Sequence, residues 1–195
     1  MLGSLYARLL AWGSWPLLAL LIVFALLCSA GFDWRTAKLE AARVERPQKA
    51  TDSAQSADSR CKGEVTLDSC LRGYSEATVR TVLASIGEKG RTLYGRTELS
   101  LDLAYPFVYG LLFTILLVHL FSARQAWVLL FPLAAVTFDL LENVTVAVMT
   151  LTYDRYLPAL AGPASFFTMI KGVFLLLSLL LVLFGALRGL FGRRA

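Results

Sequence analysis

The stretch FDLLENVTVAVM, residues 138–149, places two carboxylates and one amide inside a segment that is otherwise apolar enough to lie in lipid. Ionisable groups at membrane depth cost about 2.5–3.5 kcal/mol each on insertion scales, so they usually face a partner, a bundle interior or a water-filled cavity. Asp139, Glu142 and Asn143 are spaced i, i+3 and i+4, which places all three on one face of a helix. The stretch therefore predicts a membrane-spanning helix that turns a polar face toward other parts of the protein.

The composition of the whole chain also points to a membrane. The 195 residues are 57% hydrophobic, against about 45–50% in an average soluble domain, and their mean hydropathy is +0.63. The charges are segregated: twelve of 19 Lys and Arg lie between Arg35 and Arg96, and ten of 14 Asp and Glu lie between Asp33 and Glu98. This segregation predicts membrane spans plus one hydrophilic loop. The net charge of +5 is therefore no argument for nucleic acid, and we expect no nucleic-acid partner.

Four stretches are long and apolar enough to cross the membrane, since about 20 residues span roughly 30 Å of hydrocarbon. They cover approximately residues 12–32, 101–121, 126–151 and 164–187. We expect an all-α integral membrane protein, a bundle of four transmembrane helices with one long extracytoplasmic loop that carries a short amphipathic helix.

Three parts of the chain follow from these spans: residues 1–32 as the first transmembrane helix, 33–100 as the extracytoplasmic loop, and 101–195 as a three-helix core with a basic cytoplasmic tail. The alternative for residues 1–32 is a cleaved signal peptide, because Cys28-Ser29-Ala30 resembles a small-residue cleavage site.

Within the loop, residues 46–60 are polar and lack large apolar side chains, which predicts a flexible linker. Ser75 is a candidate N-cap for a helix with one apolar stripe, formed by Val79, Val82, Leu83 and Ile86. Gly87 and Gly90 are expected to end that helix. A short amphipathic helix of this kind either lies on the membrane or caps the bundle.

The orientation follows from basic residues beside the spans. In a four-span protein Arg8, Arg124, Arg188, Arg193 and Arg194 fall on one side, which predicts cytoplasmic termini in a plasma (inner) membrane. The loop then lies in an oxidising space, where Cys61 and Cys70 are expected to form a disulfide worth about 2–3 kcal/mol. The alternative is two free, unrelated thiols.

Polar side chains of three spans are expected to meet at one depth. At 1.5 Å per residue, Lys171 lies in the same outer half of the membrane as Asp139 and Glu142. One interpretation is a buried ion pair that sets helix register, because polar contacts between membrane helices are common. The other is a chemical site: two or three acids against one lysine leave a carboxylate that is partly protonated or bound to a ligand, and that can act as acid or base.

The candidate site residues follow from these patterns. Asp139, Glu142 and Lys171 are the candidate catalytic residues. The candidate ligand-binding residues are Asp102, Tyr105, Tyr109, Asn143, Arg91 and Arg96, of which the two arginines either hold a lipid phosphate or match interfacial headgroups. The chain has one histidine and no Cys-x-x-Cys, so neither a metal site nor a cofactor is expected.

The order of these residues resembles small bacterial multi-pass membrane proteins of unassigned activity. The resemblance rests on Gly87-x-x-Gly90-Arg91-x-x-Tyr94, then Asp102 through Pro106 and Tyr109, then Asp139-x-x-Glu142-Asn143, then a lysine in the last span. It covers residue 86 to the C-terminus. The histidine-rich pattern of metal-dependent membrane hydrolases such as alkaline ceramidases is not matched, whereas carboxylates within four spans are shared with the emopamil-binding isomerases.

Three functions are compatible with this sequence. The first is binding or processing of an amphiphilic, lipid-like ligand in the acidic/lysine pocket, which makes membrane lipids the expected partners. The second is a non-catalytic accessory or assembly protein, in which the polar cluster is structural and the extracytoplasmic loop contacts a protein partner. The third is proton- or cation-coupled transport, which four short spans would support only in an oligomer.

Overall fold

The computed structural model describes residues 15–43, 61, 66–68, 70, 72–153, 155 and 157–191. These residues form helices and no strand, as expected for the fold class. The helices are α2 (Trp15–Ala41), α4 (Glu76–Ser85), α5 (Gly87–Glu98), α6 (Leu101–Leu120), the 3-10 helix η3 (Ala123–Leu129), α7 (Leu130–Leu151) and α8 (Leu157–Phe191). The expected linker at 46–60 and the basic residues Arg8, Arg193 and Arg194 lie outside the described residues.

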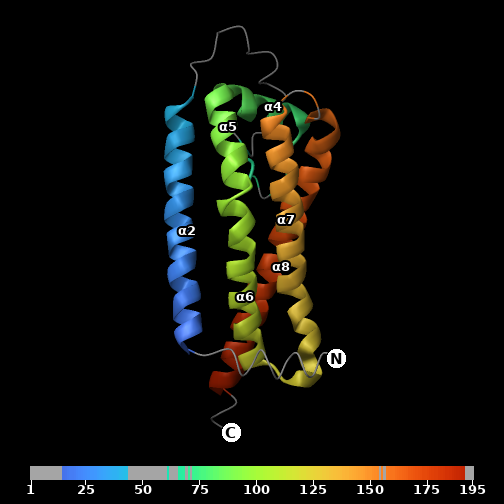
Figure 1. Ribbon diagram of the computed structural model, residues 1–195. Helices are drawn as coiled ribbons and strands as arrows, with labels where there is room; N and C mark the ends of the chain where they lie inside the picture. Colours follow the sequence, from blue (N-terminus) through green and yellow to red (C-terminus); the bar gives the residue numbers. More distant parts are fainter. Residues whose placement is uncertain are drawn as a thin grey trace.

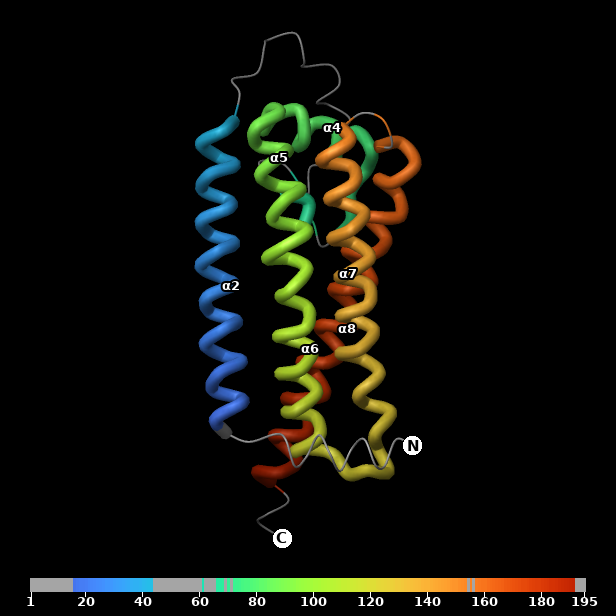
Figure 2. The backbone as a smooth tube through the Cα atoms, in the orientation of Figure 1, coloured from blue at the N-terminus to red at the C-terminus, as the bar shows by residue number. Residues whose placement is uncertain are grey.

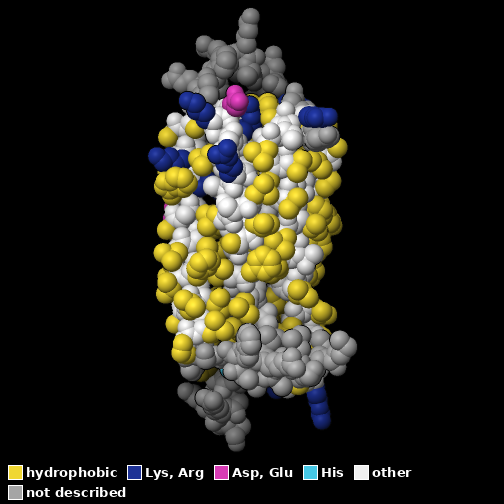
Figure 3. All heavy atoms as spheres, in the orientation of Figure 1, with side chains coloured by type: hydrophobic (Ala, Val, Ile, Leu, Met, Phe, Trp, Pro, Cys, Tyr) yellow, Lys and Arg dark blue, Asp and Glu magenta, His cyan; other side chains and the backbone are white. Residues whose placement is uncertain are grey.

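Four helical segments are long and apolar enough to cross a membrane: Pro16–Ala41, Gly87–Leu120, Ala123–Leu151 and Leu157–Phe191. Their outward-facing side chains are apolar as well, including Phe24, Phe107 and Leu176 at 46%, 59% and 56% exposure. Figure 3 shows apolar side chains over most of the length of the molecule, with basic side chains gathered near one end. A surface this apolar would be a liability in water, and together with the four apolar helices it is consistent with a membrane protein.

The long helices stand side by side in an elongated bundle, and α4 lies across one end of it (Figure 1). We refer to this end as the α4 end. The 3-10 helix η3 lies at the opposite end, the η3 end, because it joins the last turn of α6 to the start of α7. This short connection makes α6 and α7 antiparallel neighbours.

Two helix boundaries differ from the sequence-based expectation. Helix α2 continues past residue 32 to Ala41, so Arg35 belongs to a helix and not to the loop. Gly87 ends the amphipathic helix as expected, but the expectation for Gly90 is wrong. Gly87 has a φ of 63° and marks the break, but Gly90 lies inside α5, where an added Cβ would lie 2.8 Å from the Ile86 Cβ. The helical path into the second span therefore begins at Gly87 instead of residue 101.

The amphipathic helix α4 packs onto the bundle. The Ser75 side chain accepts a hydrogen bond from the Thr78 amide at 3.2 Å, which confirms the predicted N-cap. The residues of its apolar stripe are at most 4% exposed: Val79, Val82, Leu83 and Ile86. They share a core with residues of α2, α5, α7 and α8. Of the two placements considered for this helix, the structure shows the one that caps the bundle.

The segment before α4 is inserted between the long helices. Cys61 and Cys70 form the predicted disulfide. Leu67 is fully buried, and its amide donates a hydrogen bond to the Tyr94 hydroxyl at 2.8 Å. The Tyr74 amide donates to Ser165 Oγ on α8, also at 2.8 Å. In Figure 2 this teal segment runs between α5 and α7, so part of the predicted loop helps to form the interior of the bundle.

Candidate functional site

The lysine of the last span meets both acids of the third. Lys171 Nζ on α8 lies 3.1 Å from Asp139 Oδ1 on α7 and forms a second ion pair with Glu142 Oε2. Lys171 is 8% exposed and Glu142 is fully buried. The helical spacing of the two acids produces this arrangement, because residues three apart lie one above the other on the same helix face.

The remaining carboxylate oxygens of this cluster also have partners. The Tyr109 hydroxyl on α6 donates to Asp139 Oδ2 at 2.8 Å. Thr168 Oγ1, one turn before Lys171, donates to Glu142 Oε1 at 2.6 Å and lies 3.3 Å from the Tyr74 hydroxyl. Burial and the nearby Glu142 carboxylate raise the pKa of Tyr74, so this phenol stays protonated and available as a donor. All four oxygens of Asp139 and Glu142 are therefore engaged.

A second ionic cluster surrounds Arg35 on α2. Its Nη2 lies 2.8 Å from Asp68 Oδ2 in the inserted segment, and its Nη1 lies 3.3 Å from Glu98 Oε1 on α5. The same Nη1 pairs with Asp102 Oδ2 on α6. The Tyr94 hydroxyl donates to Asp68 Oδ1 at 2.9 Å. One guanidinium thus binds carboxylates from three other parts of the chain.

One hydrogen bond joins the two clusters. Asn143 Nδ2 on α7 donates to the backbone carbonyl of Asp102 at 2.6 Å, and Asn143 follows Glu142 directly. We call the joined network the ionic core. It contains five acids and two bases: Asp68, Glu98, Asp102, Asp139, Glu142, Arg35 and Lys171. Three of its buried polar atoms have no hydrogen-bond partner among the described residues: Arg35 Nε, Glu98 Oε2 and Glu142 Oε2, of which the last forms the ion pair with Lys171.

The sequence analysis did not single out Arg35, Asp68 or Glu98, since it assigned them to the hydrophilic loop. A signal for Glu98 exists in the sequence. Tyr94, Glu98 and Asp102 are spaced i, i+4 and i+8, so they share one face of any helix that begins before residue 94. The expected start of the second span near residue 101 concealed this pattern.

The other predicted ligand-binding residues lie outside the ionic core. The Tyr105 ring makes edge contacts with Phe32 and Tyr109, with centroids 5.2 and 5.5 Å away, and so packs α2 against α6. Arg91 lines a pocket at the α4 end, whereas Arg96 is exposed. The structure therefore separates the two arginines, and the roles assigned to all nine candidate site residues stay predictions.

Three acids of the Arg35 cluster also have a spacing that suits a cation. One carboxylate oxygen each from Asp68, Glu98 and Asp102 lie within 4.8 Å of one another. The Arg35 guanidinium binds all three of these carboxylates. The positively charged Arg35 side chain thus already binds these carboxylates, as a metal ion would.

Asp68 gives this cluster a dependence on pH. Burial alone would raise the pKa of Asp68, but the charges of Arg35 and Lys171 and the hydrogen bonds from Tyr94 and Arg35 outweigh burial and lower it. A carboxyl group whose pKa is lower in the folded state stabilises the fold above its unfolded pKa of about 3.9, and this stabilisation is lost as pH falls through the folded value.

We therefore expect Asp68→Asn to lower the unfolding temperature in detergent at pH 7, and the gap to wild type to shrink as the pH falls below about 4. The measurement is thermal unfolding of both proteins from pH 3 to pH 8. Asp33→Asn, at an exposed position of α2, is the control. A gap between wild type and Asp68→Asn that stays constant over this range would contradict the expectation.

No protein-family model matches this chain, and neither a curated protein nor a solved structure matches it.

Proposed function

We propose that this multi-pass membrane protein binds an amphiphile and that its ionic core receives the cationic head of that ligand. The observation that supports this proposal is the charge imbalance: five acids face two bases in a largely buried network. Uncompensated charge away from water costs several kcal/mol per group. The three excess carboxyl groups must hold protons or meet a cation, and a ligand amine would supply the missing positive charge.

The surroundings of the ionic core favour an amphiphile over a soluble amine. The helices that carry its residues expose apolar side chains on their outer faces, among them Phe107 on α6 and Val144 on α7 at 59% and 46% exposure. A ligand that approaches through the bilayer needs an apolar body. Its polar head then lowers its free energy by moving from hydrocarbon into the ionic core. In this proposal Asp102, Tyr109 and Asn143 contact the head.

If the ligand is also transformed, Asp139 and Glu142 are the acid and the base. Both contact the Lys171 ammonium, which favours the ionised form of either carboxyl group. A neighbouring carboxyl favours retention of one proton between the two. This arrangement allows proton transfer to and from a ligand with neither a metal nor a nucleophile.

A structural role is the second candidate, and it has an observation in its favour. All four oxygens of Asp139 and Glu142 are already paired within the protein, which is what a network that only sets helix register requires. In this candidate the protein is an accessory or assembly factor, and its partner contacts the α4 end. Coupled proton or cation transport, the third candidate, would additionally require a flux across liposomes.

The test compares two fluorescent probes of equal chain length, a long-chain primary amine and its acetamide, on the purified protein in detergent. We expect the amine to bind at least tenfold more tightly than the acetamide. Asp139→Asn and Glu142→Gln are expected to remove this preference without loss of a monodisperse, folded protein. Glu40→Gln is the matched control, because the Glu40 side chain is 45% exposed.

Each result decides between the candidates. Equal binding of the amine and the acetamide by wild-type protein would overturn the proposal. Loss of folding in both variants would support the structural role. A preference for the amine that survives in both variants would place the ligand outside the ionic core.

We also propose that the α4 end is extracytoplasmic. Arg124 lies in η3, and Arg188 lies in the last turn of α8. Short basic segments beside membrane spans favour the cytoplasmic side. The disulfide Cys61–Cys70 precedes α4 and suits an oxidising space. A membrane-impermeant thiol reagent should then label Ser56→Cys in intact spheroplasts, and labelling only after lysis would reverse the orientation.

A further inference from the structure

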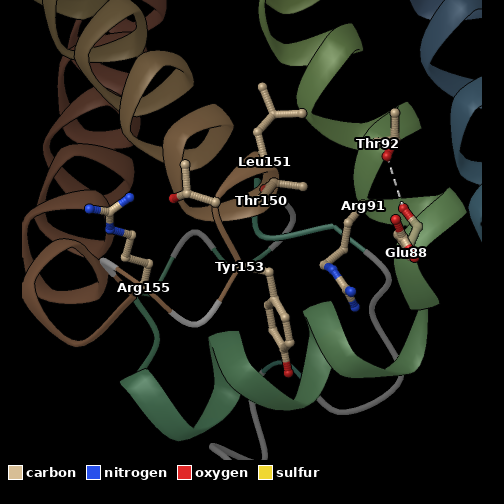
Figure 4. Close-up of a pocket in the computed structure, with 8 residues that line it drawn as sticks. Glu88, Arg91, Thr92, Thr150, Leu151, Tyr153 and Arg155 are labelled. Carbon is tan, nitrogen blue, oxygen red and sulfur yellow. Dashed lines mark hydrogen bonds between the residues drawn. The ribbon is translucent and has the colours of Figure 1, made fainter.

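A pocket outside the ionic core opens at the α4 end, between α5 and the turn that joins α7 to α8. Its volume is about 530 Å³, within the range of roughly 300–1,000 Å³ that is usual for ligand sites. Charged groups and hydroxyls line it: Glu88, Arg91, Thr150, Thr152, Tyr153 and Arg155. In Figure 4 Arg91 and Arg155 lie on either side of Tyr153.

Arg91 is held in place for an anion. The centre of its guanidinium lies 4.0 Å from the centroid of the Tyr153 ring, and its Nη1 donates to the Leu83 carbonyl at 3.1 Å. A guanidinium carries five N–H donors, so this contact orients the group and leaves donors for a ligand. Planar donors of this kind suit the oxygens of a phosphate group.

The same pocket offers negative charge beside the arginines. The Glu88 carboxylate lies on the Arg91 side of the pocket (Figure 4). Thr150 and Leu151 are the last residues of α7, and the C-terminal end of a helix carries a partial negative charge that attracts cations. A phosphate group alone would be attracted only by the basic side chains of the pocket. A zwitterion with a phosphate and an ammonium would be attracted by the basic side chains and by the negative groups.

The apolar surface beside the pocket indicates where the rest of such a ligand lies. Leu151 lines the pocket and is 47% exposed. Val148 and Val144, one and two turns before it on the same side of α7, are exposed as well. Acyl chains can therefore follow α7 while the headgroup stays with Arg91 and with Tyr153, a residue type that is common at membrane interfaces.

We propose that this pocket binds the phosphoethanolamine headgroup of a phospholipid. Arg91 contacts the phosphate, Glu88 and the end of α7 contact the ammonium, and the acyl chains lie against the outer face of α7. The proposal is independent of the ligand assigned to the ionic core.

Native mass spectrometry of the full chain in detergent tests it, with phosphatidylethanolamine, phosphatidylglycerol and phosphatidylcholine of equal chain length added in turn. We expect phosphatidylethanolamine to bind at least fivefold more tightly than the other two lipids. Arg91→Gln is expected to weaken its binding at least fivefold, and Lys89→Gln, at an exposed position on the same helix, leaves binding unchanged. Glu88→Gln should remove the preference over phosphatidylglycerol.

Further variants and ligands test the proposal against its alternatives. Tyr153→Leu, which removes the ring that orients the Arg91 guanidinium, should also weaken binding and serves if Arg91→Gln does not fold. Equal affinity for phosphatidylethanolamine and phosphatidylglycerol, or equal effects of Arg91→Gln and Lys89→Gln, would overturn the proposal. Soluble phosphoethanolamine that binds as tightly as the lipid would overturn the lipid assignment in favour of a soluble phosphate ester. Arg91→Gln should leave the preference of the ionic core for the amine probe over the acetamide unchanged, which separates this test from that of the ionic core.

Discussion

Arg35→Met is expected to lower the free energy of unfolding by about 3–5 kcal/mol, the usual cost of removing one partner from a buried ion pair. The reason is the number of acidic side chains that Arg35 contacts. Its guanidinium binds the carboxylates of Asp68, Glu98 and Asp102, and its side chain is 5% exposed. Without it these three acids, whose oxygens lie within 4.8 Å of one another, would repel each other away from water.

The measurement is equilibrium unfolding in mixed detergent and sodium dodecyl sulfate micelles, followed by circular dichroism. Lys38→Met, at an exposed position in the last turn of α2, is the matched control and should behave like wild type. Adding Glu98→Gln and Asp102→Asn to Arg35→Met should restore a large part of the stability, because the repulsion is then removed. A single variant as stable as the Lys38→Met control would show that the Arg35 cluster contributes nothing to folding.

Lys171→Met is expected to have an effect of similar size, about 3–5 kcal/mol. Its ammonium contacts Asp139 and Glu142, and all three side chains are at least nine-tenths buried. Methionine fills most of the same volume, so the loss is one of charge and not of packing. The unfolding assay used for Arg35→Met measures it, with Lys38→Met again as the control.

The decisive comparison for Lys171 is the neutral triple variant, Lys171→Met with Asp139→Asn and Glu142→Gln. Replacing a complete buried ion pair with neutral groups is often without cost, so the triple variant should recover most of the lost stability. A triple variant as unstable as Lys171→Met alone would mean that the shape of the lysine, and not its charge, holds α7 and α8 together.

Much of the architecture follows from local patterns. Hydropathy predicts the four long apolar helices, and the i, i+3, i+4 spacing of Asp139, Glu142 and Asn143 predicts the polar face of α7. The Ser75 cap and the apolar stripe that follows it predict α4, because both depend only on neighbouring residues. The extension of α2 through Arg35 was not predicted, since a charged residue directly after Trp34 reads as the end of a span.

The sequence by itself determined which segments are helical and apolar, because hydrogen bonding within a helix and the burial of a side-chain stripe are settled over a few residues. Only the tertiary structure decided that Arg35 meets partners 33, 63 and 67 positions away and that the segment before α4 enters the bundle. Those contacts depend on how far each helix is rotated about its axis and on which helices become neighbours. Both are set by packing among the whole set of helices, where buried charges must find each other to offset the cost of leaving water.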